Sequence, residues 1–93
     1  MKNLEEIKKL LTNSESDNVI SATQEWIEAA EDRPEMAEIY YLRGNAYRQM
    51  SQWGKAMTCY LHAMELQPDG PAAKAYDTAK EIMDYYSKDY YNP

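Results

Sequence analysis

The sequence has 93 residues, a length that allows one domain with a modest buried core. Its formal net charge is −6, which argues against a nucleic-acid partner because the phosphate backbone binds basic surfaces. The single cysteine, Cys59, excludes an internal disulfide, and we interpret it as a buried thiol in a reducing cytosol. No apolar run is long enough for a signal peptide or a membrane span, so we expect a cytoplasmic protein.

The amino-terminal segment carries apolar residues at helical spacing: Leu4, Ile7, Leu10 and Leu11. This spacing predicts a short amphipathic helix over residues 2–11. The polar segment 12–18 then ends this helix, because short polar side chains compete for backbone hydrogen bonds. Either Asp17 or Asn18 is the predicted N-cap of a second helix, over residues 18–31.

The central segment, residues 37–68, has the pattern of two amphipathic helices joined by a tight turn. Small residues stand where two antiparallel helices approach each other closely, at Gly44, Ala56 and Ala63. Wide rings stand beside them: Tyr40, Tyr47, Trp53 and Tyr60. We expect Tyr40, Tyr47 and Tyr60 to pack inside the protein together with the three small residues. A glycine inside a helix costs about 1 kcal/mol relative to alanine. We therefore expect close packing at Gly44 to offset that loss.

The final predicted helix follows a linker rich in proline and glycine. Pro68 marks the end of the preceding helix. Gly70 is the predicted N-cap and Pro71 the first helical residue, where a missing N–H costs nothing. One apolar face then continues over four turns and predicts a helix to about Ser87; its residues are Ala72, Ala75, Tyr76, Ala79, Ile82, Met83 and Tyr86.

The central segment resembles the tetratricopeptide repeat, a helix–turn–helix unit of about 34 residues. The resemblance rests on Tyr40, Gly44, Tyr47, Trp53, Ala56, Tyr60, Ala63 and Pro68, which stand at the family's spacing. Arg43 departs from the pattern, because the family more often has an apolar residue there. The whole chain also resembles small stand-alone tetratricopeptide proteins of Bacteroides-type bacteria, including their tyrosine-rich ending before a final Asn-Pro.

The resemblance implies an all-α fold: a right-handed α-α superhelix of about two tetratricopeptide repeats plus a C-terminal capping helix. We expect a single domain, 1–93, that consists of a degenerate repeat, a well-matched repeat, and a capping helix with its tail; the boundaries are 1–34, 35–70 and 71–93. In the capping helix, a register shifted by one residue places Ala79 where Gly44 stands in the central repeat. A small residue then again meets the neighbouring helix.

The register of the second helix has two alternatives. Counting back by the repeat length of about 34 residues aligns Ala22, Trp26 and Ala29 with Ala56, Tyr60 and Ala63. The apolar stripe is different and consists of Val19, Ile20, Thr23, Trp26, Ile27 and Ala30. Because a helix buries its apolar stripe, we favour the register in which Val19 corresponds to Ala56 and Trp26 to Ala63.

The resemblance also implies a binding scaffold with no chemistry of its own, whose concave face is lined by the first helix of each unit. The positions that correspond in this sequence are Glu38, Tyr41, Asn45, Arg48 and Gln49, followed by Tyr76, Lys80 and Met83 on the capping helix. Residues 39–64 contain no acid, so we expect a short extended peptide with an acidic residue or a free carboxylate to bind there. In the alternative interpretation, Arg48 and Lys80 only form surface ion pairs with Glu38 and Asp84.

The sequence offers little for catalysis. Its only histidine, His62, is expected on the outer side of its helix, and the glycines are scattered rather than gathered in a phosphate-binding loop. We expect no enzymatic activity, no cofactor and no metal. The alternative to a binding scaffold is a self-associating module or one subunit of a larger repeat assembly. In this alternative one of two exposed apolar sets stacks on a second copy: Leu4 and Leu11, or Tyr85, Tyr90 and Tyr91.

Overall fold

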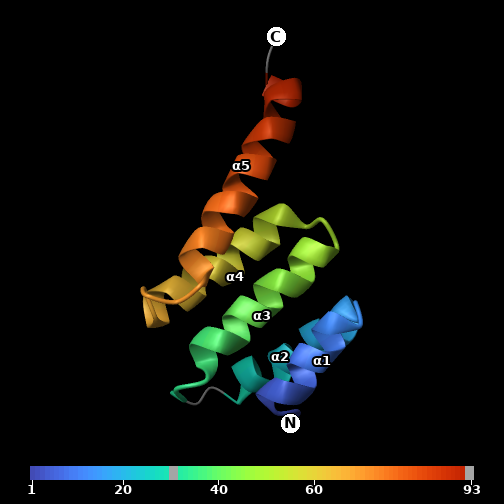
Figure 1. Ribbon diagram of the computed structural model, residues 1–93, viewed down its shortest axis with the longest axis vertical. Coiled ribbons are helices and arrows are strands. Elements are labelled where there is room, and N and C mark those ends of the chain that lie inside the picture. Colours follow the sequence, from blue (N-terminus) through green and yellow to red (C-terminus); the bar gives the residue numbers. More distant parts are fainter. Residues whose placement is uncertain (30–31, 92–93) are drawn as a thin grey trace.

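The computed structural model describes residues 1–29 and 32–91, with side chains to Tyr86 (Figure 1). Within these residues the chain forms helices and no strand: α1 (Leu4–Thr12), α2 (Ser16–Glu28), α3 (Met36–Gln49), α4 (Trp53–Leu66) and α5 (Ala72–Tyr91). Each helix packs on the next one along the chain, α1 also packs on α3, and the α3–α4 contact is the most extensive. The predicted all-α fold is confirmed.

The helix α1 begins at a capping box. The Glu6 N–H donates to the Asn3 side chain at 2.9 Å, and the Asn3 N–H donates to the Glu6 carboxylate at 3.4 Å. These bonds use donors that the first turn of a helix leaves open. Leu4 and Leu11 are half-buried against the core, so the prediction that they form an uncovered apolar face is wrong. The reason is that α1 packs on both α2 and α3.

The start of α2 also differs from the prediction. The chain turns at Ser14, whose φ of 59° lies in the left-handed region. Because this turn is compact, α2 already begins at Ser16, with Glu15 at the N-cap. The prediction of Asp17 or Asn18 as the N-cap is therefore wrong.

Burial within α2 follows its apolar stripe. Val19, Thr23 and Trp26 are buried, and in the register of the stripe they correspond to Ala56, Tyr60 and Ala63 of α4, which are buried too. Counting by the repeat length also aligns two buried residues, Ala22 and Trp26, but its third residue, Ala29, is exposed. The register that follows the stripe is therefore the one that the structure adopts. Ala30 and Glu31, the predicted end of the stripe and of the helix, lie outside the described residues.

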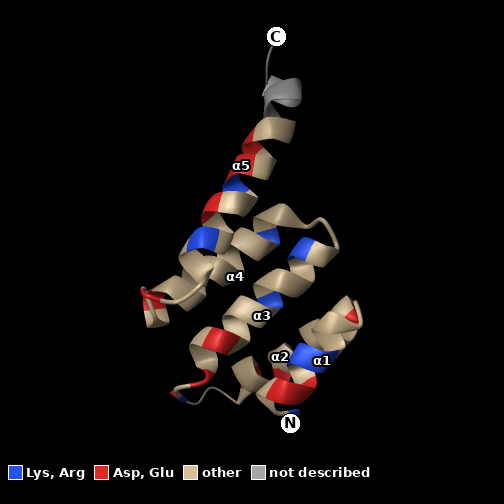
Figure 2. Cartoon of the chain, viewed as in Figure 1, with Lys and Arg blue, Asp and Glu red and all other residues tan. Residues whose placement is uncertain are grey.

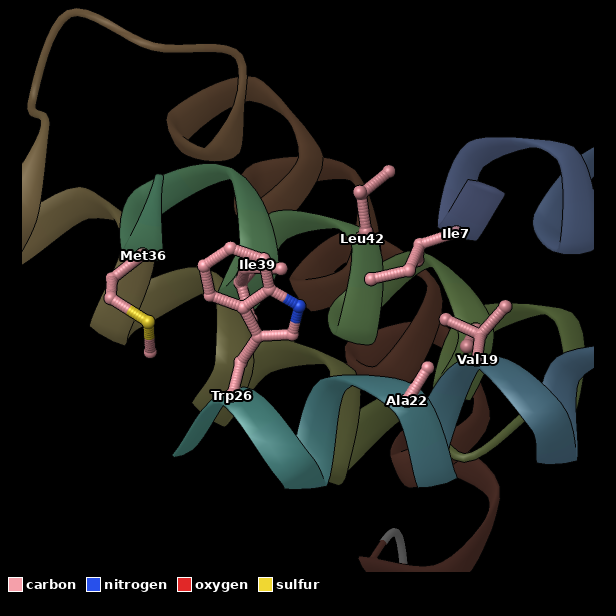
Figure 3. Packing of buried hydrophobic residues seen from close by; sticks show 8 residues of the cluster. Ile7, Val19, Ala22, Trp26, Met36, Ile39 and Leu42 are labelled. Atoms are coloured by element: carbon pink, nitrogen blue, oxygen red, sulfur yellow. The ribbon is translucent and has the colours of Figure 1, made fainter. Parts of the chain in front are cut away.

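The core has two clusters of buried side chains. The first lies between α1, α2 and α3 and contains aliphatic residues around the Trp26 ring, as Figure 3 shows; its buried members are Ile7, Val19, Ala22, Trp26, Met36, Ile39, Leu42 and Ala46. The Trp26 indole N–H donates to the Lys2 carbonyl at 2.8 Å, so its polar atom has a partner. The second cluster lies between α4 and α5 and packs alanines around the Tyr60 ring; its buried members are Ala56, Tyr60, Ala63, Ala72, Ala75 and Ala79.

The helices α3 and α4 approach each other closely at Gly44. A Cβ atom added there would lie 2.5 Å from Cε1 and 2.7 Å from Cδ1 of Tyr60. These distances are shorter than van der Waals contact allows, and the fully buried Tyr60 ring has no space to move away. The sequence-based interpretation of Gly44 as a close-packing residue is therefore confirmed.

The Tyr60 hydroxyl reaches back to α3. It donates a hydrogen bond to Oδ1 of Asn45 at 2.6 Å. Burial raises the pKa of Tyr60 to about 12, although the Arg48 guanidinium acts in the opposite direction. The hydroxyl therefore keeps its proton at neutral pH and remains the donor in this bond.

Two rings that we expected inside the protein lie at its edge. Gly44, Ala56, Tyr60 and Ala63 are buried as predicted, but Tyr40 and Tyr47 are only half-buried. Tyr40 stacks on the exposed His62 with a centroid distance of 4.8 Å. One face of each ring is covered by a polar or charged group: His62 stacks on Tyr40, and Arg43 and Lys55 lie over Tyr47.

The helix α5 is longer than predicted. It begins at Ala72, so Pro71 precedes the first helical residue, and it continues to Tyr91 rather than Ser87. Ala79 is fully buried, as the shifted register predicted. The first half of α5 packs on α4, whereas its second half projects beyond the other helices (Figure 1).

The contact at Gly44 generates a prediction with a matched control. Gly44→Ala should lower the free energy of unfolding by about 1–3 kcal/mol, because the clash with Tyr60 outweighs the gain in helix propensity of about 1 kcal/mol. At the exposed Gly54, an added Cβ would meet only Cε of Met83, at 3.9 Å. Gly54→Ala should therefore leave stability unchanged or raise it by up to about 1 kcal/mol. Urea unfolding followed by circular dichroism measures both, and equal effects of the two substitutions would contradict the packing argument.

Candidate functional site

The predicted binding residues of α3 differ in what they contact. The Glu38 carboxylate accepts from Nζ of Lys8 on α1 at 2.9 Å. This hydrogen bond is the main cause that raises the pKa of the Lys8 amine. Glu38 is therefore paired with α1 and not with Arg48, against the alternative interpretation of the sequence. Arg48 is exposed and takes part in no ion pair among residues 1–29 and 32–91.

Gln49 joins α3 to the turn between α1 and α2. Its Oε1 accepts from the Ser16 hydroxyl at 2.6 Å, and its Nε2 donates to the Leu11 carbonyl at 2.9 Å. The side chain is exposed, but both ends of its amide are engaged. This role was missed from the sequence, because the partners lie far from Gln49 along the chain.

A pocket of about 250 Å³ lies where the start of α3, the end of α4 and the start of α5 meet. Two of the predicted binding residues, Glu38 and Tyr41, line it. Small residues from all three segments form much of the remaining wall: Ala37, Ala63, Gly70 and Ala72. We call this pocket the inner pocket. An apolar side chain of moderate size fits a wall of this kind.

Asn45 and Arg48 lie further along α3, and both interact with the Tyr60 hydroxyl. Asn45 accepts the hydrogen bond from that hydroxyl, and the Arg48 guanidinium acts to lower the pKa of Tyr60 against the larger effect of burial. The structure therefore groups Asn45 and Arg48 around Tyr60, about one and two turns of α3, respectively, after Tyr41 of the inner pocket.

The predicted residues of α5 are less closely connected to this set. Tyr76 is half-buried and packs on the cluster around Tyr60. Lys80 and Met83 are exposed, and Lys80 forms no ion pair with Asp84 in the part of the chain that the structure describes. The extensive contacts of α5 are with α4 and not with α3. The eight predicted binding residues therefore lie on two helices, α3 and α5, and do not enclose a single cavity.

A second hollow, of about 410 Å³, shares no residue with the inner pocket. It lies between α2, α3 and α4 and is lined by Ile27, Tyr40, Arg43, Tyr47, Lys55 and His62 among others. We call it the outer groove. The sequence contained two signals for it: the unusual Arg43 and the absence of acids from residues 39–64.

The thiol of Cys59 borders this groove but is buried. Burial raises its pKa, so it stays a protonated thiol at neutral pH, as we interpreted it from the sequence. Among the described residues, no group of histidine, cysteine, aspartate and glutamate is arranged to hold a metal ion. In the same part of the chain, no helix has the length and apolar character needed to cross a membrane.

Comparison with known proteins places these features in a family. The sequence model of the tetratricopeptide repeat matches residues 37–69. No curated protein matches the chain. Among solved structures, the solution NMR structure of the Bacteroides fragilis protein BF1650 is similar, with a TM-score of 0.84 and 38% sequence identity. The match covers 99% of this chain and 91% of that protein.

The repeat match contains the close contact of α3 and α4, and the structural match extends the likeness over nearly the whole chain. Together with the helical stack described above, these similarities show that the chain belongs to the tetratricopeptide repeat family.

Proposed function

We propose that the protein is a non-enzymatic scaffold that binds a protein or peptide segment on the concave face of its helix stack. In this proposal α1 and α2 form a degenerate repeat, α3 and α4 form the well-matched repeat, and α5 is the cap. The family typically supplies interaction modules, and the net charge of −6 disfavours nucleic acid as the partner. The composition, with a single buried thiol, favours the cytoplasm.

The observation that carries this proposal is the arrangement of hydrogen-bond donors around Tyr60. Oδ1 of Asn45 uses one of its two lone pairs to accept from Tyr60, and the amide group also carries two N–H donors that a ligand can bind. Arg48 adds an exposed guanidinium that forms no ion pair within the described residues. Both groups are donors, and a carboxylate is the acceptor that best satisfies them.

The inner pocket supplies the second half of the proposed site. Tyr41 lies seven residues before Arg48 on the same helix, a distance of about 10 Å at 1.5 Å per residue. An extended peptide covers that distance with about three residues. A peptide whose carboxylate binds Arg48 therefore places an apolar side chain, about three residues away, at the pocket beside Tyr41.

This arrangement assigns different roles to the predicted residues. Arg48, Asn45 and Tyr41 contact the ligand. Gln49 and Glu38 instead hold α1 and the following turn against α3, through the bonds to Leu11 and Lys8. On α5, Tyr76 packs on the cluster around Tyr60, while Lys80 and Met83 are exposed and contact only a ligand long enough to reach that helix.

A second candidate function is self-association through α5. Its apolar face is buried by α4 at Ala75 and Ala79. The same face continues at Met83 and Tyr86, whose side chains are 39% and 57% exposed. Met83 lies beside the start of α4, since its Cε would be 3.9 Å from a Cβ added at Gly54, and the end of α5 projects beyond the other helices (Figure 1).

A second copy fits this uncovered face, because two α5 helices can pack antiparallel through the same apolar residues. Such a contact is self-complementary, as a two-fold dimer requires. Of the tail rings that we considered from the sequence, Tyr85 is 69% exposed, and the side chains of Tyr90 and Tyr91 lie outside the described residues.

The scaffold proposal predicts the result of an affinity pull-down. We expect the Asn45→Ala, Arg48→Ala double variant to lose most of the partner that the parent protein captures, because both donors to the carboxylate are removed. The control variant, Asn18→Ala with Lys74→Ala, removes one amide and one charge from other exposed positions and should capture the parent amount. Circular dichroism verifies that both variants fold. Equal capture by all three proteins would exclude this face as the binding site.

The self-association candidate predicts that the sedimenting mass depends on concentration. The parent should shift from 10.8 kDa towards twice that mass as concentration rises. Met83→Ser with Tyr86→Ser should remain monomeric because it removes the apolar contact. The control, Leu61→Ser with Leu66→Ser, changes exposed apolar residues of α4 and should behave like the parent. A parent that stays monomeric at all concentrations would reject this candidate.

A further inference from the structure

The outer groove contains a positive charge that the described part of the protein does not neutralise. The half-buried Arg43 guanidinium donates to the Ile20 carbonyl at 3.0 Å, to Oγ1 of Thr23 at 2.9 Å and to Oε1 of Gln24 at 2.9 Å. These acceptors are all uncharged. They satisfy N–H groups and fix the side chain, but the charge itself has no anionic partner among residues 1–29 and 32–91. An anion that enters the groove would gain from this charge.

Lys55 adds a second positive charge at the same place. Its Nζ lies 5.6 Å from the centroid of the Tyr47 ring, and Cζ of Arg43 lies 5.6 Å from the same centroid. Lys55 is exposed and forms no ion pair in the described part of the chain. The residues that line the groove include no carboxylate. The groove is therefore positively charged, although the whole protein carries a net charge of −6. Figure 2 shows that the acidic residues lie mainly at the helix ends and on α5.

The opposite part of the groove offers an aromatic surface. Tyr40 and His62 stack with an interplanar angle of 20°, and Ile27 of α2 lies in the same lining. An apolar or aromatic side chain gains by packing on such a surface. The groove therefore joins a site for an anion to a site for an apolar side chain.

From this arrangement we infer that the outer groove is a second binding site, which takes an acidic segment of a protein partner. Its carboxylates lie near Lys55 and Arg43, and an adjacent apolar or aromatic side chain packs on the stacked Tyr40 and His62. This site is separate from the concave face, because the outer groove and the inner pocket share no residue. A partner of this kind is complementary to the groove in charge, and the protein could hold two segments at once.

An NMR titration with defined peptides tests this inference. The probe is the capped peptide Ac-EEYLEE-amide, and the control peptide Ac-QQYLQQ-amide replaces each carboxylate by an amide of the same shape. We expect the acidic peptide to shift the backbone amide signals of Tyr40, Tyr47, Lys55 and His62. Lys55→Gln should weaken its binding about fivefold, because one of the two charges is lost. Lys74→Gln, which makes the same charge change at an exposed position of α5, should bind like the parent.

Three results would overturn the inference. The first is the absence of saturable shifts with the acidic peptide, and the second is equal binding of the two peptides. The third is a loss of affinity in Arg48→Gln but not in Lys55→Gln. That third result would place the acidic peptide on the concave face, so that the outer groove is excluded while the proposed function stands. Conversely, a loss only in Lys55→Gln supports the groove and leaves the concave face to be tested by the pull-down.

Discussion

The contact between Gly44 and the Tyr60 ring determines how the other parts of this protein are placed. It allows α3 and α4 to approach so closely that a Cβ on α3 would lie 2.5 Å from the ring. The ring is fully buried and also anchors the alanines through which α5 packs on α4. Its hydroxyl donates a hydrogen bond that orients Asn45, and the Arg48 guanidinium acts to lower the pKa of that hydroxyl. One glycine therefore connects the core, the position of the cap and the donors of the proposed concave site.

Much of the fold could be predicted from the sequence because its signals are local. The small and aromatic residues of 37–68 stand at fixed spacing, so they identify the helix pair and its contact face. The apolar stripe of α2 indicated its register better than counting from the repeat length, because Val19 and Thr23 are buried whereas Ala29, which the count aligns with the buried Ala63, is exposed. Helix starts were less accurate, since the compact turn at Ser14 depends on backbone geometry that short polar residues do not specify.

The candidate sites were harder to predict because they depend on contacts between distant segments. The resemblance selected residues on α3 and α5. It did not distinguish Arg48, which is in no ion pair within the described residues, from Gln49 and Glu38, which hold α1 and the following turn. The unusual Arg43 was visible in the sequence, whereas its uncharged partners on α2 were not. Leu4 and Leu11 looked uncovered because their partners on α2 and α3 lie beyond any local pattern.

The most direct test of the central contact is a double-mutant cycle between α3 and α4. Free energies of unfolding would be measured for the parent, Gly44→Ala, Tyr60→Leu and the combined variant. If the methyl group of Gly44→Ala destabilises the protein by meeting the Tyr60 ring, its effect should largely disappear when the ring is replaced by leucine. We predict a coupling energy of about 1–2 kcal/mol between the two positions. Additive effects, with no coupling, would show that the Gly44–Tyr60 contact does not determine the packing of this helix pair.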